Sequence, residues 1–404
     1  MTASPKPRSD IRARLGLRPI INVSGTMTTL GASIVVPQAV KAVSEVLPEW
    51  VDVTDLHRMA SRAIAKATGT EAGFVTASAA AGITLAIAGC MTGPDLGKIE
   101  QLPDTSGMKN EVAIQIGHLT GYGASVEQAI RLAGGVCVPV GNIVDAKPYQ
   151  LAHKITDRTA AALYVVSHST SQYGQMPLDV FARVAHDHGV PVIADLASEY
   201  DLTGFAAAGA DLVIYSAHKF LGGPTAGIVG GRKALVRATF LQNHGIGRGM
   251  KVGKESIVGT IAALEAWAAR DHAGIRKQEK SHLDLWVKRF SGLPGVTATI
   301  IPDPTANPLD RLKLDVDPEG ARITAWELAD ALGAGDPPVA VRDMEAERGY
   351  FYLDPCNLHP GEAEIVADRV VAELGEARKR NRPQQYTVAE RQAKRLDALL
   401  RWPD

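Results

Sequence analysis

Cysteine is scarce in this chain. Among its 404 residues there are three, Cys90, Cys137 and Cys356, and each lies far from the others within apolar sequence. A disulfide framework needs more cysteines, and a zinc site needs them at short, regular spacings. We therefore expect three buried thiols in a reducing compartment and no metal site.

An excess of one charge is lacking as well. The 43 Lys and Arg residues balance 44 Asp and Glu residues, for a net charge of −1. This balance gives no electrostatic reason to expect nucleic acid or an anionic membrane as a partner.

Long hydrophobic segments are also missing. The first twenty residues have no apolar core of the signal-peptide type. Residues 72–91 are apolar but rich in Gly, Ala, Ser and Thr, which is typical of a buried strand, turn and helix and not of a membrane span. We expect a cytoplasmic protein without a membrane partner.

The chain of 404 residues exceeds the usual size of one core. Strand-like and helix-like segments alternate along its first two thirds. This alternation predicts an α/β fold with a mostly parallel sheet in a large domain, followed by a smaller α+β domain. The expected strands of the large domain are residues 73–76, 112–116, 136–140, 161–166, 190–194, 211–215 and 227–231. The expected boundaries are 1–55 for an arm and a segment associated with the small domain, 56–273 for the large domain, 274–376 for the small domain and 377–404 for a basic, amphipathic tail.

The tail begins with a basic run and then becomes helical in period, from Val388 to Trp402. A basic run is usually a solvated surface. Packing of the tail helix on a partner subunit is the alternative.

Residues 190–231 carry the strongest functional signal. Two short apolar runs end at Asp195 and at Tyr215, and the second is followed by Ser216, Ala217, His218 and Lys219. Such runs are typical of strands buried on both faces of a parallel sheet. Ligands of open α/β sheets bind at the carboxyl ends of the strands, so an acid and a lysine are expected at a ligand site.

An aspartate and a lysine are the two protein groups that pyridoxal 5′-phosphate (PLP) chemistry needs. The lysine forms a Schiff base, and the carboxylate keeps the pyridine nitrogen protonated. Taken singly, Asp195 as a helix cap and Lys219 as a solvated loop residue are equally ordinary roles. The glycine-rich residues 221–227 favour the cofactor, because glycine lets the backbone pass close to a ring and its phosphate.

Ser78-Ala79-Ala80-Ala81-Gly82 follows the first expected strand and opens a helix. Small residues there leave backbone N–H groups and the helix dipole available for a phosphate. Tight packing of the helix on the sheet requires small residues too, so this motif does not decide the matter alone.

Several motifs together resemble the fold-type I PLP enzymes of the selenocysteine synthase-like superfamily, which includes aminosugar-acid ammonia lyases. The resemblance runs from about Ile20 to Val370. Its motifs are residues 21–26, 67–72, 216–224, 250–255 and 337–342, ending near 353–355. The lysine loop and the segment after Met250 are the most specific, and they indicate the group without specifying the reaction.

The resemblance implies a role for each matching residue at the cofactor. Lys219 would form the Schiff base, Asp195 would pair with the pyridine nitrogen, and Ala197 would lie against one ring face. His118 or Tyr122 would stack on the other face, although a capped loop histidine is as good an explanation of His118. The residues implied at the phosphate are Ser78, Ala80, Ala81 and Ser216.

The resemblance also implies substrate-binding residues. Arg342 would bind the substrate carboxylate, for which a bidentate guanidinium is suited. A surface ion pair with Asp343 or Glu345 is the alternative. Other candidates for the substrate acid or phosphate are Arg248, Lys251 and Lys254, and His57 and Arg58 would reach a neighbour's site in a homodimer or higher homo-oligomer.

Two departures from the group's transferases are visible. Only a short arm precedes Ile20, where bacterial selenocysteine synthases carry a tRNA-binding portion, so we expect no selenium transfer to tRNA. Cys356 stands where the transferase pattern tends to have arginine.

The resemblance leads us to expect a lyase acting on a small hydroxyamino acid or aminosugar acid. Lys219 would remove the α-proton, a β-hydroxyl would leave with help from His218, and a 2-keto acid and ammonia would result. Transamination, racemisation and aldol cleavage use the same apparatus. A non-catalytic binding protein, with RNA bound at the basic tail, is the alternative from another class.

Overall fold

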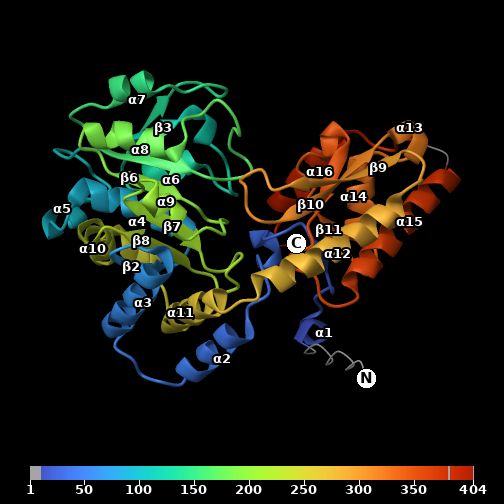
Figure 1. The fold of residues 1–404 in the computed structure, drawn as a ribbon, viewed down its shortest axis with the longest axis horizontal. Coiled ribbons are helices and arrows are strands. Elements are labelled where there is room, and N and C mark those ends of the chain that lie inside the picture. Colours follow the sequence, from blue (N-terminus) through green and yellow to red (C-terminus); the bar gives the residue numbers. More distant parts are fainter. Residues whose placement is uncertain (1–10, 381–382, 404) are drawn as a thin grey trace. The chain divides into compact units, whose positions relative to one another are not determined.

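The computed structural model describes residues 11–380 and 383–403. They form two compact units: residues 33–270, and the described residues of 1–32 and 271–404. Figure 1 labels the elements of both. The predicted α/β architecture with a mostly parallel sheet is confirmed.

The unit of residues 33–270 is built on a seven-stranded sheet. Strand β8 runs antiparallel to both of its neighbours, and the other pairs are parallel. In sheet order the strands are β2 (Ala72–Thr76), β8 (Gly227–Gly231), β7 (Leu212–Ser216), β6 (Val192–Asp195), β5 (Thr159–Val165), β3 (Glu111–Gln115) and β4 (Val136–Val140).

Both faces of this sheet are buried. Along β7, Val213 and Tyr215 belong to one apolar cluster, whereas Leu212 and Ile214 belong to the cluster on the opposite face. Successive side chains of a strand point to opposite faces, so a strand covered on both sides is apolar at every position. This explains why the strands read as continuous apolar runs in the sequence.

The helices of this unit supply the two clusters. Helices α3, α8 and α11 pack on one face, and α4, α6 and α10 pack on the other. The helices are α2 (Pro37–Val46), α3 (Val53–Thr68), α4 (Ala79–Thr92), α5 (Leu96–Gln101), α6 (Val126–Leu132), α7 (Pro148–Lys154), α8 (Leu178–Asp187), α9 (Gly204–Ala207), α10 (Lys233–Leu241) and α11 (Lys254–Ala268). Single 3-10 turns lie at η2 (Ile116–His118), η3 (Gln242–His244) and η4 (Ile246–Met250).

The second unit combines two small sheets with helices. Strand β1 (Ile21–Val23) pairs in parallel with β11 (Val339–Val341), so a segment near the start of the chain joins this unit. The antiparallel sheet has β10 (Asp310–Val316) between β9 (Val296–Pro302) and β12 (Tyr350–Leu353). The helices are α1 (Ile11–Leu15), α12 (His272–Phe290), α13 (Pro318–Ala321), α14 (Ala325–Ala334), α15 (Glu362–Arg380) and α16 (Val388–Leu400), with 3-10 turns η1 (Thr28–Leu30) and η5 (Ala346–Arg348).

Helix α15 continues through Gly375 to Arg380. Leu374 and Ala377 on either side of this glycine are fully buried in the core of the unit. Burial of apolar side chains therefore outweighs the modest cost of glycine inside a helix.

The tail helix α16 packs on the unit that contains it. Arg391 is 8% exposed. It forms ion pairs with Asp330 of α14 at 2.7 Å and with Asp343. Arg391 thus anchors the tail helix, whereas Lys379 and Arg380 of the basic run are exposed, as predicted for a solvated surface. Arg382 of the basic run lies outside the described residues.

The cysteines are free and half-buried, a lower burial than we predicted. Burial raises the pKa of Cys90 to about 12 and that of Cys137 to about 11, so these thiols are protonated at neutral pH. Over residues 11–380 and 383–403, His, Cys, Asp and Glu form no group that could hold a metal. None of the helices in this part of the chain has both the length and the hydropathy that crossing a membrane requires.

A buried charge cluster stabilises the antiparallel sheet of the second unit. Arg311 on β10 lies with its Nη2 2.6 Å from Asp303 Oδ2 and its Nε 3.0 Å from Asp354 Oδ2. All three side chains are almost inaccessible to solvent. Removing one member of such a cluster leaves buried charge without compensation.

We predict that Arg311→Ala lowers the free energy of unfolding by about 3–5 kcal/mol, because two buried carboxylates lose their partner. Urea denaturation of both proteins measures the change. As a control, Arg401→Ala removes a surface pair with Asp397 and is expected to cost less than about 1 kcal/mol. Equal losses in the two variants would contradict the role of the buried cluster.

Candidate active site

Strands β6 and β7 are parallel neighbours, and Asp195 lies opposite Ile214 in their register. Asp195 is the last residue of β6, and the segment carrying Lys219 begins directly after β7 ends at Ser216. The prediction that these two strands end at the same edge of the sheet is therefore confirmed.

The Asp195 carboxyl is buried, at 7% exposed. Burial raises its pKa to about 6; the positive charge of Lys219 and a hydrogen bond from the Ala197 backbone oppose this shift. Within the described residues, Oδ1 of Asp195 has no hydrogen-bond partner. A buried acceptor without a donor is costly, so the carboxylate is suited to a donor that the protein does not supply, such as a pyridinium N–H.

Lys219 is half-buried, and the backbone around it is held by Ser33. The Oγ of Ser33 lies 2.8 Å from the carbonyl oxygen of His218 and 2.6 Å from that of Lys219. Sequence reasoning missed Ser33, because nothing near it in the sequence indicates a contact with the lysine loop.

Arg270 holds the next part of the same loop. Its Nη1 donates to the carbonyl of Phe220 at 2.8 Å and its Nη2 to that of Leu221 at 3.2 Å. The guanidinium also lies 4.6 Å from the centre of the Trp267 ring. Arg270 follows α11 without any motif, so no sequence signal revealed this contact either.

The glycines after Lys219 are explained by the protein's own packing. Gly222 has a φ of +70°, and a Cβ there would lie 2.8 Å from Val36 Cγ1. A Cβ on Gly223 would lie 3.0 Å from the carbonyl oxygen of Ala217. The chain's own packing is a further reason for glycine at these positions, and close approach of a cofactor stays a prediction.

His218 is neutral at neutral pH. Burial lowers its pKa, and the charge of Lys219 lowers it further. Its Nδ1 lies 3.0 Å from Ser216 Oγ, and its Nε2 has no hydrogen-bond partner among the residues described. A neutral imidazole next to the lysine can accept or donate a proton at Nε2.

The start of α4 and the end of β7 meet at the same edge of the sheet. Thr76 and Ser216 pair with Gly227 from its two sides, and a Cβ on Gly227 would lie 2.2 Å from the carbonyl oxygen of Ser78. Ser78 caps α4 by accepting a hydrogen bond from the N–H of Ala81 at 3.1 Å. The remaining N–H groups of the first turn have no partner inside the helix, as an anion site requires.

Two side chains from the loop after β3 lie near this edge. His118 is buried; its Nδ1 accepts from the N–H of Val165 at 3.1 Å, and its ring lies edge-on to Tyr164 at 4.5 Å. Burial lowers the pKa of His118 to about 4. Burial and the charge of Asp195 raise the pKa of Tyr122. Stacking of either ring on a cofactor stays a prediction.

His57 and Arg58 lie on α3. The His57 ring packs edge-on against Phe74 at 6.3 Å and Phe240 at 5.3 Å, and burial lowers its pKa to about 4. Arg58 forms an exposed ion pair with Asp55 on its own helix. His57 therefore contributes to the core of its unit, and a contact with a neighbour's site stays a prediction.

The three basic residues of the segment after η3 differ in their surroundings. Arg248 and Lys251 are exposed. Lys254 donates from Nζ to the carbonyl of Leu47 at 2.9 Å and to that of Glu49, just after α2. The contacts of Lys254 indicate a structural role, and Arg248 and Lys251 are left as candidates for substrate binding.

Arg342 lies in the second unit, next to β11. The backbone N–H of Arg342 donates to the carbonyl of Tyr352, and the N–H of Tyr352 donates to the carbonyl of Arg342. Burial lowers the pKa of Arg342, and the nearby Arg311 lowers it further. An ion pair with Asp343 or Glu345 was our alternative. Asp343 accepts from Arg391 and Arg395, whereas the charge of Glu345 opposes the lowering of the Arg342 pKa, so the Glu345 alternative stays open.

A family model described as SelA, L-seryl-tRNA selenium transferase, matches residues 20–278. The chain belongs to this family. It is 36% identical over 361 residues to D-glucosaminate-6-phosphate ammonia lyase of Salmonella typhimurium (strain 14028s), which is 89% of this chain and 97% of that enzyme. A solved structure of D-glucosaminate-6-phosphate ammonia-lyase is 35% identical, with a TM-score of 0.82 over 93% of this chain and all of that chain.

A second relative is named for another reaction. The 5′-C-glycyluridine monooxygenase-decarboxylase of a Streptomyces species is 36% identical over 359 residues, 88% of this chain and 90% of that enzyme. The predicted membership in the selenocysteine synthase-like group and the fold-type I architecture are confirmed. The SelA-family chain is an enzyme, and PLP is its cofactor.

The shifted pKa of Asp195 predicts a pH effect on the protein without PLP. The folded state binds this proton more tightly than the unfolded state, so wild-type stability falls relative to Asp195→Asn as pH rises from 3.8 to about 6. We expect a relative loss of about 2–3 kcal/mol. Urea denaturation of both proteins between these pH values measures it. A difference that does not change with pH would contradict the burial of this carboxyl.

Proposed function

We propose that the chain is a PLP-dependent lyase that releases ammonia from a small β-hydroxyamino acid or aminosugar acid. The observation that carries this proposal is the 36% identity to D-glucosaminate-6-phosphate ammonia lyase, which extends over 97% of that enzyme. The meeting of Asp195 and Lys219 at neighbouring strand ends supports it. We also propose a cytoplasmic homodimer, in keeping with the fold-type I resemblance.

The proposed reaction begins with transfer of the α-proton of the substrate to Nζ of Lys219. PLP, when bound, supplies the electron sink for the pair of electrons left at the α-carbon. That pair forms the bond to the β-carbon while the β-hydroxyl leaves as water. Its proton is returned by Nζ of Lys219, and neutral His218 assists by a hydrogen bond from Nε2 to the departing oxygen. Hydrolysis of the resulting enamine consumes one water, so the net products are a 2-keto acid and ammonia.

Asp195 and the edge of the sheet bind the cofactor in this proposal. Oδ1 of Asp195, a buried acceptor, takes the N–H of the pyridine ring, and the charge of Lys219 favours the ionised carboxylate. Ala197 lies against the ring. The N–H groups that open α4, together with the hydroxyls of Ser78 and Ser216, bind the phosphate.

Arg342 binds the substrate carboxylate in this proposal. Burial and the nearby Arg311 lower its pKa, acidic neighbours such as Glu345 partly oppose this, and a bidentate anion stabilises the charged form further. Arg248 and Lys251 are exposed cations suited to a phosphate or acid at the far end of the substrate.

The relative named as a monooxygenase-decarboxylase supports a second candidate, oxidative decarboxylation of an amino acid. Such a reaction breaks the bond to the carboxyl carbon and consumes O2. Oxygen uptake and CO2 release therefore separate it from the lyase reaction.

The substrate screen is the direct test. We predict that the PLP-loaded enzyme releases 2-keto acid and ammonia in equal amounts, without O2, from a member of a panel of D- and L-hydroxyamino acids and aminosugar acids. D-Glucosaminate 6-phosphate belongs in the panel. Keto acid that depends on an added acceptor, an aldehyde with glycine, or CO2 with O2 uptake would each contradict the lyase assignment.

Lys219→Ala is expected to lower the rate of keto acid release by about 10²–10⁴-fold, because the general base is lost. Lys109→Ala, at an exposed lysine, is the matched control and should retain the wild-type rate. Borohydride treatment of the wild type is expected to attach PLP to the peptide containing Lys219. Attachment to another lysine, or a fully active Lys219→Ala, would refute the assigned role.

We predict that Arg342→Lys raises KM about tenfold with a smaller change in kcat, since a bidentate contact with the substrate carboxylate becomes a single one. Arg348→Lys is the control at an exposed arginine nearby. Steady-state kinetics measure both parameters. A KM that is unchanged in Arg342→Lys would rule out carboxylate binding by this residue.

A further inference from the structure

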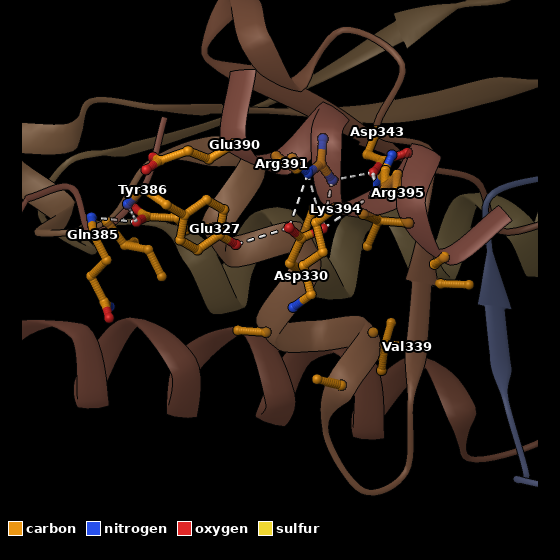
Figure 2. Close-up of a pocket in the computed structure, with 18 of the residues that line it drawn as sticks. Glu327, Asp330, Val339, Asp343, Gln385, Tyr386, Glu390, Arg391, Lys394 and Arg395 are labelled. Carbon is orange, nitrogen blue, oxygen red and sulfur yellow. Dashed lines mark hydrogen bonds and ion pairs between the residues drawn. The ribbon is translucent and has the colours of Figure 1, made fainter. Parts of the chain in front are cut away.

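Two arginines of the tail helix α16 bind the segment that follows β11. This segment, residues 342–348, begins with Arg342 and includes η5, and we call it the arginine segment. Its Asp343 accepts from Arg391 and, at 2.6 Å, from Arg395, as Figure 2 shows. Hydrogen bonds between ionised groups are the stronger kind. The residue next to the proposed carboxylate-binding arginine is therefore held firmly by α16.

The same two arginines also bind α14. Asp330 of α14 accepts from Arg391 at 2.7 Å and from Arg395 at 3.2 Å (Figure 2). Each guanidinium thus bridges an aspartate of α14 and Asp343 of the arginine segment. Because a guanidinium is planar and presents its donors in a fixed geometry, such a bridge fixes the two carboxylates relative to each other. Arg391 is buried, so water competes little for its hydrogen bonds.

The chain just before α16 is attached to α14 as well. The hydroxyl of Tyr386 donates to Asp330 at 2.8 Å, and the N–H of Tyr386 donates to Glu327 at 3.1 Å. The carbonyl of Tyr386 accepts from the indole of Trp326 at 3.1 Å. Helix α14 packs into the core of its unit and is therefore a rigid base for these contacts.

Contacts at both ends hold the arginine segment. At its start, Arg342 exchanges backbone hydrogen bonds with Tyr352 of β12. Towards its end, Glu347 accepts from the side chain of Gln392 on α16 at 3.4 Å. Arg342 and Asp343 are consecutive, so the bonds to the Asp343 carboxylate restrict the backbone dihedrals between the two residues. They therefore also restrict the direction in which the side chain of Arg342 leaves the backbone.

We propose that α16 positions Arg342, through Asp343, to bind the substrate carboxylate. Arg391 and Arg395 are the positioning residues. A bidentate contact requires a defined orientation of the guanidinium, and a misplacement of about 1 Å costs about 10²-fold in rate. The proposal rests on the proposed role of Arg342, and it adds the tail helix to the elements on which substrate binding depends.

The test measures carboxylate binding without turnover of a substrate. Aminooxyacetate and methoxyamine both react with the aldehyde of PLP, and aminooxyacetate carries a carboxylate that methoxyamine lacks. The absorbance of the PLP-loaded enzyme gives the affinity for each compound. We call the ratio of the two affinities the carboxylate preference. In the wild type we expect aminooxyacetate to bind about tenfold or more tighter.

Arg391→Ala is expected to lower the carboxylate preference about fivefold, because the Asp343 carboxylate is no longer held by this buried bridge. Arg395→Ala, at a half-exposed arginine, is a milder variant and should lower it about twofold. The control Arg369→Ala removes an ion pair within α15 of the same unit and should keep the wild-type preference. An equal loss in Arg369→Ala and Arg391→Ala, or no loss in both α16 variants, would overturn the proposal.

A double-mutant cycle tests whether Arg391 acts through Asp343. Asp343→Ala alone is expected to lower the carboxylate preference about fivefold. The double variant should lose no more than the stronger single variant, since both changes break the same contact. Losses that multiply in the double variant would show that Arg391 acts by another route and would contradict the proposal.

Arg342→Lys separates this proposal from the proposed function. It should lower the carboxylate preference directly, because it changes the group that binds the carboxylate. If Arg342→Lys keeps the preference, the role of Arg342 is wrong and the positioning proposal is wrong with it. If Arg342→Lys lowers the preference and Arg391→Ala does not, the positioning proposal alone is wrong. Circular dichroism of each variant verifies that the helices are retained.

Discussion

The site depends on the balance between burial of the Asp195 carboxyl and the positive charge of Lys219. Burial favours the protonated acid, while the lysine and the N–H of Ala197 favour the carboxylate, and together they leave the pKa raised to about 6. The balance exists because β6 and β7 are neighbours in a sheet that is covered on both faces. Contacts from Ser33 and Arg270 to the backbone after β7 then fix the loop that carries the lysine.

Much of the large unit could be predicted from its sequence, because continuous apolar runs between polar turns are typical of strands in a doubly covered sheet. The ends of those runs placed Asp195 beside the loop of Lys219. Ser33 and Arg270 could not be predicted, since their partners are backbone carbonyls that carry no residue-specific signal. The glycines after the lysine were noticed, but their contacts within the protein could not be predicted, because close neighbours such as Val36 are distant in sequence.

The contacts inside the second unit, above all its charge pairs, were harder to predict. Strand β1, near the start of the chain, pairs with β11 of residues 339–341. Arg391 of the tail helix pairs with Asp330 of α14. Charge pairs between distant segments leave no periodic pattern in a sequence. Two neighbouring arginines differ in their surroundings. Arg311 is paired with two buried aspartates. Burial and Arg311 lower the pKa of Arg342, and the charge of Glu345 partly opposes this.

The central claim is that the Asp195 carboxylate keeps the pyridine nitrogen of PLP protonated. NMR of enzyme loaded with PLP that is isotopically labelled at this nitrogen measures the protonation directly. The account predicts the chemical shift of a protonated nitrogen at neutral pH in the wild type and that of an unprotonated nitrogen in Asp195→Asn. The same shift in both proteins would contradict it.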